Sequence, residues 1–400
     1  MRQPEKEWKL MMRKKQAGFT LMETMVSLVV LLGVSAIVMS GMVQMMYTQG
    51  TIANRTEMHT SVRSATELLQ QEIGQAGKVS LPPPPPGTAW AMVGPAPAGV
   101  AVNLATGIIT LDVTFNVVDS AGNPVLFEGE WVTVEAGQTL ALCPTCGRET
   151  VQLTCAAGPG NCPNSSNTWR ATFVDNHVLA PIPGTGTVGA QISLPGAFST
   201  GIVPPAAGVM PAPPAGYAGY PVFPAGYPVG NQPAKGSSGT VLKLYGDVNG
   251  DGEMVFVEYT CVQGTPAAPG FLYRNQVRFM DSQVVPPNDP SKIVLTGVLQ
   301  NPNDAAGNPV PCFTYQLQTK GGLNAAASDL AFVTDVAVTL TVQTSNPDPQ
   351  THILQQETKA LLNISPRNVY DAWDFATLDY SDRIQPAPPL IKANILINYQ

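Results

Sequence analysis

The sequence has little charge, few histidines and no basic stripe with interleaved aromatic residues. Charged residues make up 12% of the 400 residues, about half of the quarter that is usual in soluble proteins. The three histidines lie far apart, and none stands in a motif with a nucleophile or a metal partner: His59, His177 and His352. We therefore expect no enzyme, and the missing basic stripe argues against a nucleic-acid partner.

An apolar stretch of membrane length follows a basic N-terminal segment. From Phe19 to Met46 the only ionisable side chain is Glu23, and the stretch exceeds the ~20 residues that cross a bilayer as a helix. Residues 1–18 carry six basic and two acidic side chains, so their net charge is +4. Because Lys and Arg hold their flank on the cytoplasmic side, we predict a single-pass protein whose C-terminal region lies outside the cytoplasm. Taking this +4 from the total of −7 leaves −11 for the remainder, which also argues against nucleic acid.

Glu23 separates this helix from an ordinary membrane anchor. A carboxylate within a membrane helix costs roughly 2.5–3.5 kcal/mol on insertion scales and usually has a partner. The run 18–23, Gly-Phe-Thr-Leu-Met-Glu, resembles the class III signal of type IV pilins and their relatives, Gly-Phe-Thr-Leu-x-Glu. The alternative is a Glu23 that lies near the cytoplasmic interface and reaches water.

The resemblance implies a processing step and a role in assembly. A prepilin peptidase would cut between Gly18 and Phe19, release residues 1–18 as a leader peptide, and methylate the new N-terminal Phe19. The cut precedes the apolar stretch, so the helix stays attached, unlike in a conventional secretory signal. Glu23 would pair with the methylated amine of a neighbouring subunit's first residue and set the register of assembly.

The helix is predicted to cover residues 19–78, of which 19–46 span the membrane. In its second half apolar residues recur at spacings of mostly three to four, which predicts a stripe that packs on a globular region: Ile52, Met58, Val62, Ala65, Leu69 and Ile73. Two glycines and the prolines at 82–86 end the helix. Residues 63–77 also resemble the end of this helix in PilW-type minor pilins.

The chain beyond the helix is predicted to be β-structure. Residues 110–117 alternate between apolar and polar side chains, as in a half-buried strand, and 125–134 is predicted to return as another strand. Further strands are expected at 150–154, 168–174, 241–245, 254–261, 276–280, 293–299, 312–318, 330–342 and 352–362, with no second helix. We therefore predict an α+β fold, in which a long N-terminal helix packs on a mostly antiparallel β C-terminal region.

Two β regions are predicted, 88–180 and 240–400, with a linker between them. The segment 181–239 is rich in Pro and Gly and repeats Pro-Ala-Gly-Tyr at 214–217 and 224–227. It has too little periodic apolar surface for a core of its own, which favours a linker or loop. Its tyrosines could instead dock it onto a neighbour.

One pattern occurs twice, Asp-x-Ala-Gly-Asn-Pro-Val at 119–125 and 304–310. Gly-Asn-Pro strongly favours a turn. The repeat therefore marks either a duplicated hairpin or the same turn chemistry reached twice.

All six cysteines lie in the part predicted to be outside the membrane, where disulfides persist. Four fall within a span of twenty residues: Cys143, Cys146, Cys155 and Cys162. For these we expect two local disulfides, and the alternative is a zinc site, which is disfavoured because the second pair is spaced by six residues rather than two. Cys261 and Cys312 sit in predicted strands and could form a bridge, although spacing alone does not fix connectivity.

One motif has the chemistry of a ligand site. Residues 247–258 satisfy the calcium-loop template, which has oxygen ligands at positions one, three and five, glycine at six and glutamate at twelve. The candidate ligands are Asp247, Asn249, Asp251, Glu253 through its backbone carbonyl, and Glu258. Both flanks have the pattern of strands, so the loop would be grafted onto a β-hairpin; the alternative is a solvated hairpin tip.

These patterns and the resemblance together predict a minor pilin of the PilW type. The resemblance implies insertion into the inner membrane, processing, and incorporation through the pilus assembly platform into a type IV pilus at the cell surface, or into its initiating tip complex. Other pilins, minor pilins, prepilin peptidase and membrane lipid would be its partners. Two alternatives stay open: a pseudopilin of a type II secretion system, and an adhesin or calcium-dependent surface-binding module that uses the pilin helix only as an anchor.

Overall fold

The computed structural model describes residues 20–94, 101–102, 108–137, 146–158, 166–199, 201–205, 236–278, 288–320, 330–386 and 388. By its internal contacts the chain divides into two compact units, residues 1–57 with 345–355, and residues 58–344 with 356–400. As predicted, one long apolar N-terminal helix precedes a mostly antiparallel β region.

Helix α2 is Leu21–Gln75, close to the predicted bounds. The Thr20 hydroxyl caps its N-terminus by accepting a hydrogen bond from the backbone N–H of Glu23 over 3.3 Å. Thr-x-x-Glu is the capping-box pattern, which satisfies a backbone donor that the first helical turn leaves unpaired. Within the described part of the chain, α2 is the one helix long and apolar enough to cross a membrane.

In the first unit, the loop 345–355 packs on the turn of α2 that follows the apolar stretch. The Thr51 hydroxyl donates to Asp348 Oδ2 over 2.9 Å, and Asp348 Oδ1 accepts the backbone N–H groups of Gln350 and Thr351. The Thr351 N–H, the Thr51 hydroxyl and the Gln350 N–H lower the pKa of Asp348 to about 2, because each of them favours the carboxylate. The loop is thus held to the helix by an ionised side chain.

In the second unit, α2 buries one apolar stripe. Five of the six predicted positions are buried, with at most 8% of each residue exposed: Met58, Val62, Ala65, Leu69 and Ile73. Ile52, the sixth, belongs to the first unit and is 59% exposed, so the stripe begins later than predicted. Burial of these side chains at roughly 1.5–3 kcal/mol each holds this half of α2 on the β-structure.

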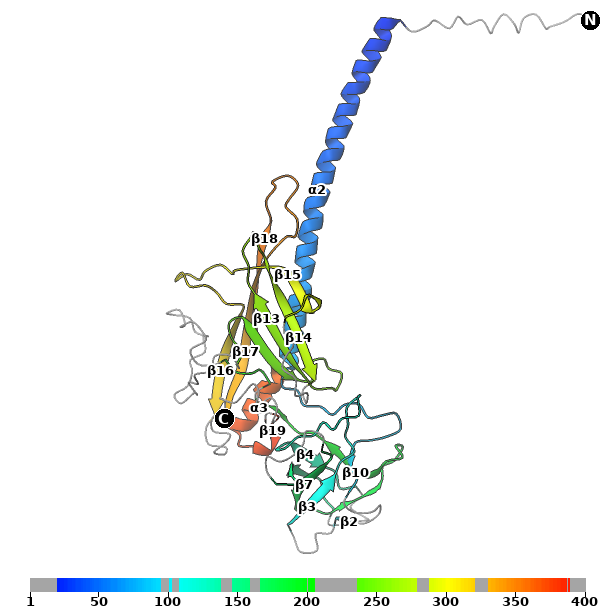
Figure 1. Cartoon of the computed structure of the whole chain (residues 1–400), viewed down its shortest axis with the longest axis vertical. Coiled ribbons are helices and arrows are strands. Elements are labelled where there is room, and N and C mark those ends of the chain that lie inside the picture. The colour runs from blue at the N-terminus through cyan, green and yellow to red at the C-terminus, as the bar shows by residue number, and fades with distance from the viewer. Residues whose placement is uncertain are drawn as a thin grey trace, which may run out of the picture. The chain divides into compact units, whose positions relative to one another are not determined.

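The stripe packs into the largest core, which also contains a seven-stranded antiparallel sheet (Figure 1). The strand order is β12-β13-β14-β15-β17-β16, with β18 also paired to β17. The bounds are β12 Val241–Gly246, β13 Val255–Val262, β14 Gly270–Arg278, β15 Ile293–Leu299, β16 Phe313–Lys320, β17 Leu330–Gln343 and β18 Gln356–Ile364. Two predicted strands of this region differ in their bounds, and the others are close to the observed ones. The segment predicted at 276–280 is the end of β14, which begins at Gly270, and 279–280 lie outside the described residues. The segment predicted at 352–362 begins as a strand only at Gln356.

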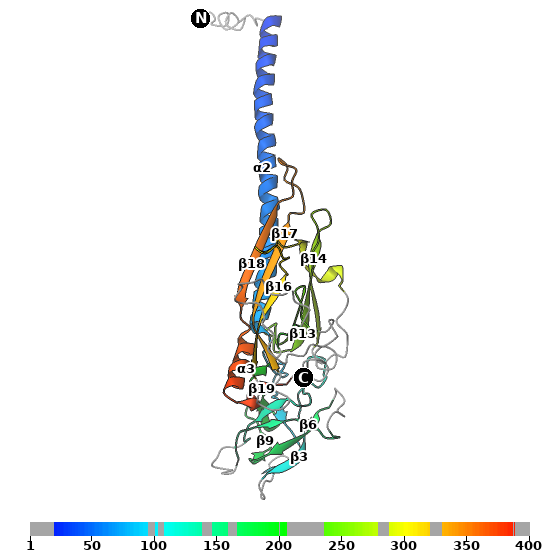
Figure 2. The ribbon, with the colours of Figure 1, turned by 90° about the vertical axis from the view of Figure 1, so that its left-hand side faces the viewer.

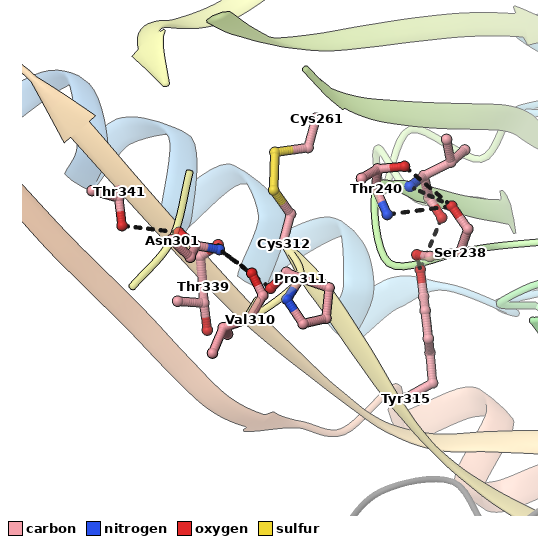
Figure 3. The surroundings of a disulfide bond; sticks show 11 residues. Ser238, Thr240, Cys261, Asn301, Val310, Pro311, Cys312, Tyr315, Thr339 and Thr341 are labelled. Carbon is pink, nitrogen blue, oxygen red and sulfur yellow. Dashed lines mark hydrogen bonds between the residues drawn. A yellow bond between two sulfur atoms is a disulfide. The ribbon is translucent and has the colours of Figure 1, made fainter. Parts of the chain in front are cut away.

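A disulfide between Cys261 and Cys312 joins β13 to the residue before β16 (Figure 3). The predicted bridge is therefore confirmed. Beside it the Tyr315 hydroxyl lies 2.9 Å from the carbonyls of both Ser238 and Val241. These contacts tie the start of β12 to β16, so the sheet is cross-linked through both a covalent bond and a buried hydroxyl.

A second core lies among smaller sheets formed by residues 91–193. One sheet has the order β1-β10-β4-β5, with β9 also paired to β10, and another has the order β3-β7-β6, while β2 pairs with β8. The bounds are β1 Ala91–Met92, β2 Ala101–Val102, β3 Ile109–Thr114, β4 Trp131–Val134, β5 Glu149–Gln152, β6 Thr154–Cys155, β7 Thr168–Phe173, β8 His177–Val178, β9 Ala180–Pro181 and β10 Val188–Ser193.

The predicted strand at 125–134 is shorter in the structure, where only Trp131–Val134 forms β4. Gly129 has a φ of +90°, which an extended strand does not allow. Glu130 then turns its carboxylate back to accept the backbone N–H of Phe127. The preceding apolar residues are still buried, so the hydrophobic run marks core but not strand.

Part of the predicted linker is instead folded. Residues 188–193 form β10, the strand that pairs with β1, β4 and β9, and Phe198, Ile202 and Val203 are fully buried. The linker prediction is therefore wrong for the described residues of 188–205. The apolar runs of this segment are too short to show a period, but they pair with strands from other parts of the chain. The Pro-Ala-Gly-Tyr repeats lie outside the described residues.

A second helix also corrects the sequence prediction. Helix α3, Arg367–Thr377, buries Val369, Ala372 and Ala376 in a third small core. Pro366 precedes it without a side-chain cap, and its aromatic residues are modest helix formers, so tertiary packing stabilises it. Two short 3-10 helices, η1 Pro290–Lys292 and η2 Ser381–Arg383, and a parallel pair, β11 Ala197–Phe198 with β19 Ile384–Gln385, complete the fold (Figure 2).

The two Asp-x-Ala-Gly-Asn-Pro-Val segments adopt the same turn. In each, the aspartate backbone N–H donates to the asparagine carbonyl and the glycine has a φ of +82° or +84°. In each, one aspartate oxygen also accepts two backbone N–H groups of the turn. A single bridge closes each turn at the equivalent position, Val118 with Pro124 and Asn303 with Pro309. The first turn lies between β3 and β4 and the second between β15 and β16.

Candidate functional site

The first candidate site is the N-terminal part of α2. Gly18 and Phe19, the predicted processing residues, lie outside the described residues. Glu23 is in the first turn of the helix, exposed, with its backbone N–H bonded to Thr20. Among the residues that the structure describes, none forms an ion pair with Glu23. Its charge is therefore not neutralised by the described part of its own chain.

The surroundings of Glu23 on the helix are apolar. Each large apolar side chain from Leu21 to Tyr47 is exposed, by at least 43% in every case. An apolar helix surface of this size is stable only in lipid or against other apolar helices. Glu23 is the only charge on it, because the next ionised side chain along the helix is Arg55.

Residues 13–43 match the family model of the prokaryotic N-terminal methylation motif. The match includes the expected cut between Gly18 and Phe19, as well as Glu23. It identifies a type IV pilin-like signal, the kind that prepilin peptidase processes, and the single apolar helix fits a membrane-anchored pilin-like protein. No curated protein and no solved structure shows significant similarity to the chain.

A second glutamate of α2, which the sequence analysis did not single out, is buried in the second unit. Glu72 is 3% exposed. It accepts hydrogen bonds from the Tyr259 hydroxyl over 2.6 Å and from the Arg274 guanidinium over 2.5 and 2.9 Å. Burial raises the pKa of Tyr259, and the negative charge of Glu72 raises it further. The only sequence signal was an acidic residue one position before a residue of the apolar stripe, Ile73.

The candidate calcium loop connects β12 to β13, as predicted, and its first residue is already paired. Asp247 is fully buried, and its Oδ2 lies 2.6 Å from Lys78 Nζ while its Oδ1 accepts the Gly252 N–H. Burial acts to raise the pKa of Asp247, but the Lys78 ammonium, the Ser80 hydroxyl and the Gly252 N–H together lower it below its ordinary value.

The other candidate ligands also contact protein donors. Asn249 Oδ1 accepts a hydrogen bond from Arg274 over 3.3 Å. Asp251 Oδ1 accepts the backbone N–H of Glu253, whose own Oε1 accepts the backbone N–H of Ser120. The side-chain oxygens of this loop therefore hold the hairpin together and bind it to Arg274 and to Ser120.

Glu258 lies on β13, with its Oε2 3.6 Å from Lys243 Nζ across the strand pair. Among the described residues, no three His, Cys, Asp or Glu side chains are grouped so as to hold a metal ion. The five predicted ligands therefore share one hairpin, but the carboxylates of Asp247, Asp251 and Glu258 are not grouped as a metal site in this structure.

The cysteine cluster is described in part. Cys146 and Cys155 are each disulfide-bonded, while Cys143 and Cys162 lie outside the described residues. A sulfur in a disulfide is not a thiolate, the form that ligates zinc. Both described cysteines are buried, and Cys155 belongs to the second core.

His177 is a buried polar residue whose role was not predicted. It is 0% exposed; its Nδ1 lies 2.9 Å from the Glu135 carbonyl and its Nε2 2.8 Å from Glu149 Oε1. Glu149 also accepts the backbone N–H groups of Val174 and Asp175. Burial acts to raise the pKa of Glu149, but these donors together lower it, so an ionised carboxylate is fixed at the start of β5.

Proposed function

We propose that the protein is a minor pilin of the PilW type that is incorporated into a type IV pilus or its initiating tip complex. The observation that carries the proposal is the methylation motif at 13–43, followed by an exposed apolar helix with one carboxylate. The proposed activity is assembly, with no chemical step assigned to the chain. The β-structure of the second unit would form the outward surface of the subunit.

In the proposed assembly step, apolar helices of neighbouring subunits cover the surface between Leu21 and Tyr47. Leaving a carboxylate unpaired at that depth costs roughly 2.5–3.5 kcal/mol. The methylated amine of a neighbour's Phe19 would remove this cost by pairing with Glu23. Subunits joined out of register would keep the cost, so the pair selects one arrangement.

The proposed location before assembly is the inner membrane, with the second unit outside the cytoplasm, and afterwards the pilus at the cell surface. The net charge of +4 on residues 1–18 supports this orientation. Other pilins, minor pilins, prepilin peptidase, the assembly platform and membrane lipid are the proposed partners.

The first experiment is to purify the protein from its native membrane and determine its N-terminus by mass spectrometry. A chain beginning at N-methylated Phe19 is expected. A chain that keeps residues 1–18, or is cut elsewhere, would contradict processing. The second is deletion of the gene with electron microscopy of the cells. Loss of pili supports assembly, whereas normal pili with lost attachment would favour the adhesin.

Calcium binding at residues 247–258 is a second, separate proposal. It is supported by the oxygen-bearing side chains at positions 247, 249 and 251. It is also supported by Gly250 and Gly252, whose φ angles of +73° and +90° allow a tight loop. Since the Lys78 ammonium contacts Asp247, calcium would have to displace it, so binding would be an exchange of cations. Affinity in the extracellular range of ~0.1–1 mM is expected.

Isothermal titration of the full chain in detergent tests the exchange. The wild type should release or absorb heat on addition of calcium, and a variant with Asp247→Ala and Asp251→Ala should not. The variant Lys78→Met, which removes the competing ammonium, should bind more tightly. Equal titration curves for wild type and the double variant would refute the site.

A further inference from the structure

A cleft of about 470 Å³ lies between strands β4 and β5 on one side and the segment from α3 to η2 on the other. This volume is within the range of small-molecule sites, roughly 300–1,000 Å³. Most of the lining side chains are polar, and Phe375 is the single aromatic one among them. Thr133 and Thr150 also line the cleft, and their hydroxyls are 3.0 Å apart across β4 and β5.

The two walls of the cleft are fixed to each other by a buried amide. Gln385, on β19, is 0% exposed. Its Oε1 accepts the Trp131 backbone N–H over 2.9 Å, and its Nε2 donates to the carbonyls of Trp131 and Pro195 over 2.8 and 2.9 Å. The cleft is therefore preformed, which lowers the entropy cost of binding a ligand.

Two guanidinium groups stand at the cleft. The Arg383 guanidinium lies 5.7 Å from the centre of the Phe375 ring and 5.5 Å from that of Tyr380. Among the described residues no carboxylate is within ion-pair distance of it. Arg148 has its Nε 3.2 Å from Glu135 Oε1 and a side chain that is 64% exposed. The two aromatic rings hold the Arg383 guanidinium in place. Its N–H donors are therefore directed to a ligand or to water.

An acceptor also lines the cleft, the carboxylate of Asp382. The Glu149 carboxylate is not a second one, because Glu149 alternates with Thr150 along β5 and points to the opposite face of the strand. There it is bonded to the buried His177 and to two backbone N–H groups. A ligand that fits must therefore accept hydrogen bonds from guanidinium groups and donate one to a carboxylate.

We propose that this cleft binds an acidic sugar, such as a uronic acid residue of a polysaccharide. A sugar carboxylate would be bound by Arg383 and Arg148, because guanidinium and carboxylate pair in a planar, two-bond geometry. One of its hydroxyls would donate to Asp382. A peptide is the poorer fit, because interfaces with peptides depend on buried apolar anchors, and Phe375 is the one large apolar side chain in the lining.

The test is saturation-transfer NMR on the full chain in deuterated detergent, with galacturonic acid as the probe. Galactose, which lacks the carboxylate, and acetate, which lacks the ring, are the comparison ligands. We expect binding of galacturonic acid with a Kd on the order of 1 mM, weaker binding of galactose and no displacement by equimolar acetate.

Three variants sharpen the test. Arg383→Gln and Arg148→Gln should each weaken binding by roughly tenfold or more, the usual loss for a charged hydrogen bond. Arg367→Gln changes an exposed arginine at the start of α3 that does not line the cleft and should leave the Kd unchanged. Melting curves would show that the variants stay folded. Absence of transfer to the wild type, equal affinity in the Arg383 variant, or displacement by acetate would each overturn the proposal.

Discussion

Helix α2 contains two glutamates in opposite situations. Glu72 is 3% exposed and bonded to Arg274 and Tyr259 within its own chain. Glu23 is on an exposed apolar surface, and no described residue forms an ion pair with it. The sequence around Glu23 is apolar, whereas Glu72 lies among glutamines in the amphipathic half of the helix, where its burial is not evident.

The comparison shows where a charge on this helix is neutralised. The partners of Glu72 come from β13 and β14, which the fold brings to the helix, so Glu72 stabilises the subunit. In the proposed function the partner of Glu23 comes from another molecule, so Glu23 stabilises the assembly. Substitution of either residue should therefore affect one property and spare the other.

The largest effect on stability is expected from Glu72→Ala. The change leaves the Arg274 guanidinium buried without its carboxylate, which costs roughly 3–5 kcal/mol. Chemical denaturation in detergent would measure it. The control Glu67→Ala removes an exposed pair with Arg63 on the same helix, and exposed pairs contribute little to stability because water screens them.

A double variant tests whether the loss of stability in Glu72→Ala comes from the broken ion pair rather than from a change in the helix. Glu72→Met with Arg274→Met removes both charges and should recover most of the lost stability, because apolar residues can replace a buried pair at little cost. A double variant as unstable as Glu72→Ala would contradict this explanation.

A smaller effect, with a pH dependence, is expected from Asp247→Asn. Removing the hydrogen-bonded charge pair with Lys78 should cost roughly 1.5–3 kcal/mol at pH 7. Because the folded-state pKa of Asp247 is lowered, its contribution is present above the unfolded value of about 4 and is lost as the pH falls below it. Melting curves of wild type and variant should therefore converge towards pH 3. Parallel curves across that range would be inconsistent with an ionised Asp247.

The contribution of Glu130 to stability should depend on pH in the opposite direction to that of Asp247, and its effect should be smaller. It is 0% exposed and burial raises its pKa well above the ordinary value, while one of its oxygens has no partner among the described residues. The neutral form is therefore favoured on folding, and the stability it brings is lost as the pH rises above about 4.3. Relative to Glu130→Gln, the wild type should lose roughly 1–2 kcal/mol between pH 4 and pH 7. A constant difference between the two melting temperatures would exclude this assignment.

Sequence patterns predicted the elements whose partners are nearby or whose pattern is long. The second half of α2 has a clear apolar period over residues 58–73, and β15 was predicted at its observed bounds, Ile293–Leu299. The two aspartate turns also follow from local chemistry, since Asp119 and Asp304 bond backbone N–H groups only two to four residues away. Such features depend little on the rest of the fold.

The features that were missed depend on residues far apart in the sequence. Strand β10 lies in a segment rich in Pro and Gly, and it is completed by β1 and β4. Gln385 resembles any polar C-terminal residue until the fold places it against Trp131, 254 residues earlier. Glu72 and Arg274 are likewise 202 residues apart. No local pattern contains these pairs, so the cleft and the buried ion pair could be found only in the structure.

The smallest effect on stability is expected at the other glutamate, with Glu23→Gln. This side chain forms no ion pair within the described chain, so its removal should change the free energy of unfolding of the isolated subunit by less than about 0.5 kcal/mol. Pilus assembly, in contrast, should be lost or strongly reduced, because the amide cannot pair as an anion with a neighbour's methylated Phe19. The matched control Glu57→Gln, an exposed glutamate of the same helix beyond the apolar stretch, should assemble normally. Counting pili by electron microscopy decides between them. Normal pili with Glu23→Gln would mean that the Glu23 carboxylate has no role in assembly, and the contrast with Glu72 would then be one of exposure alone.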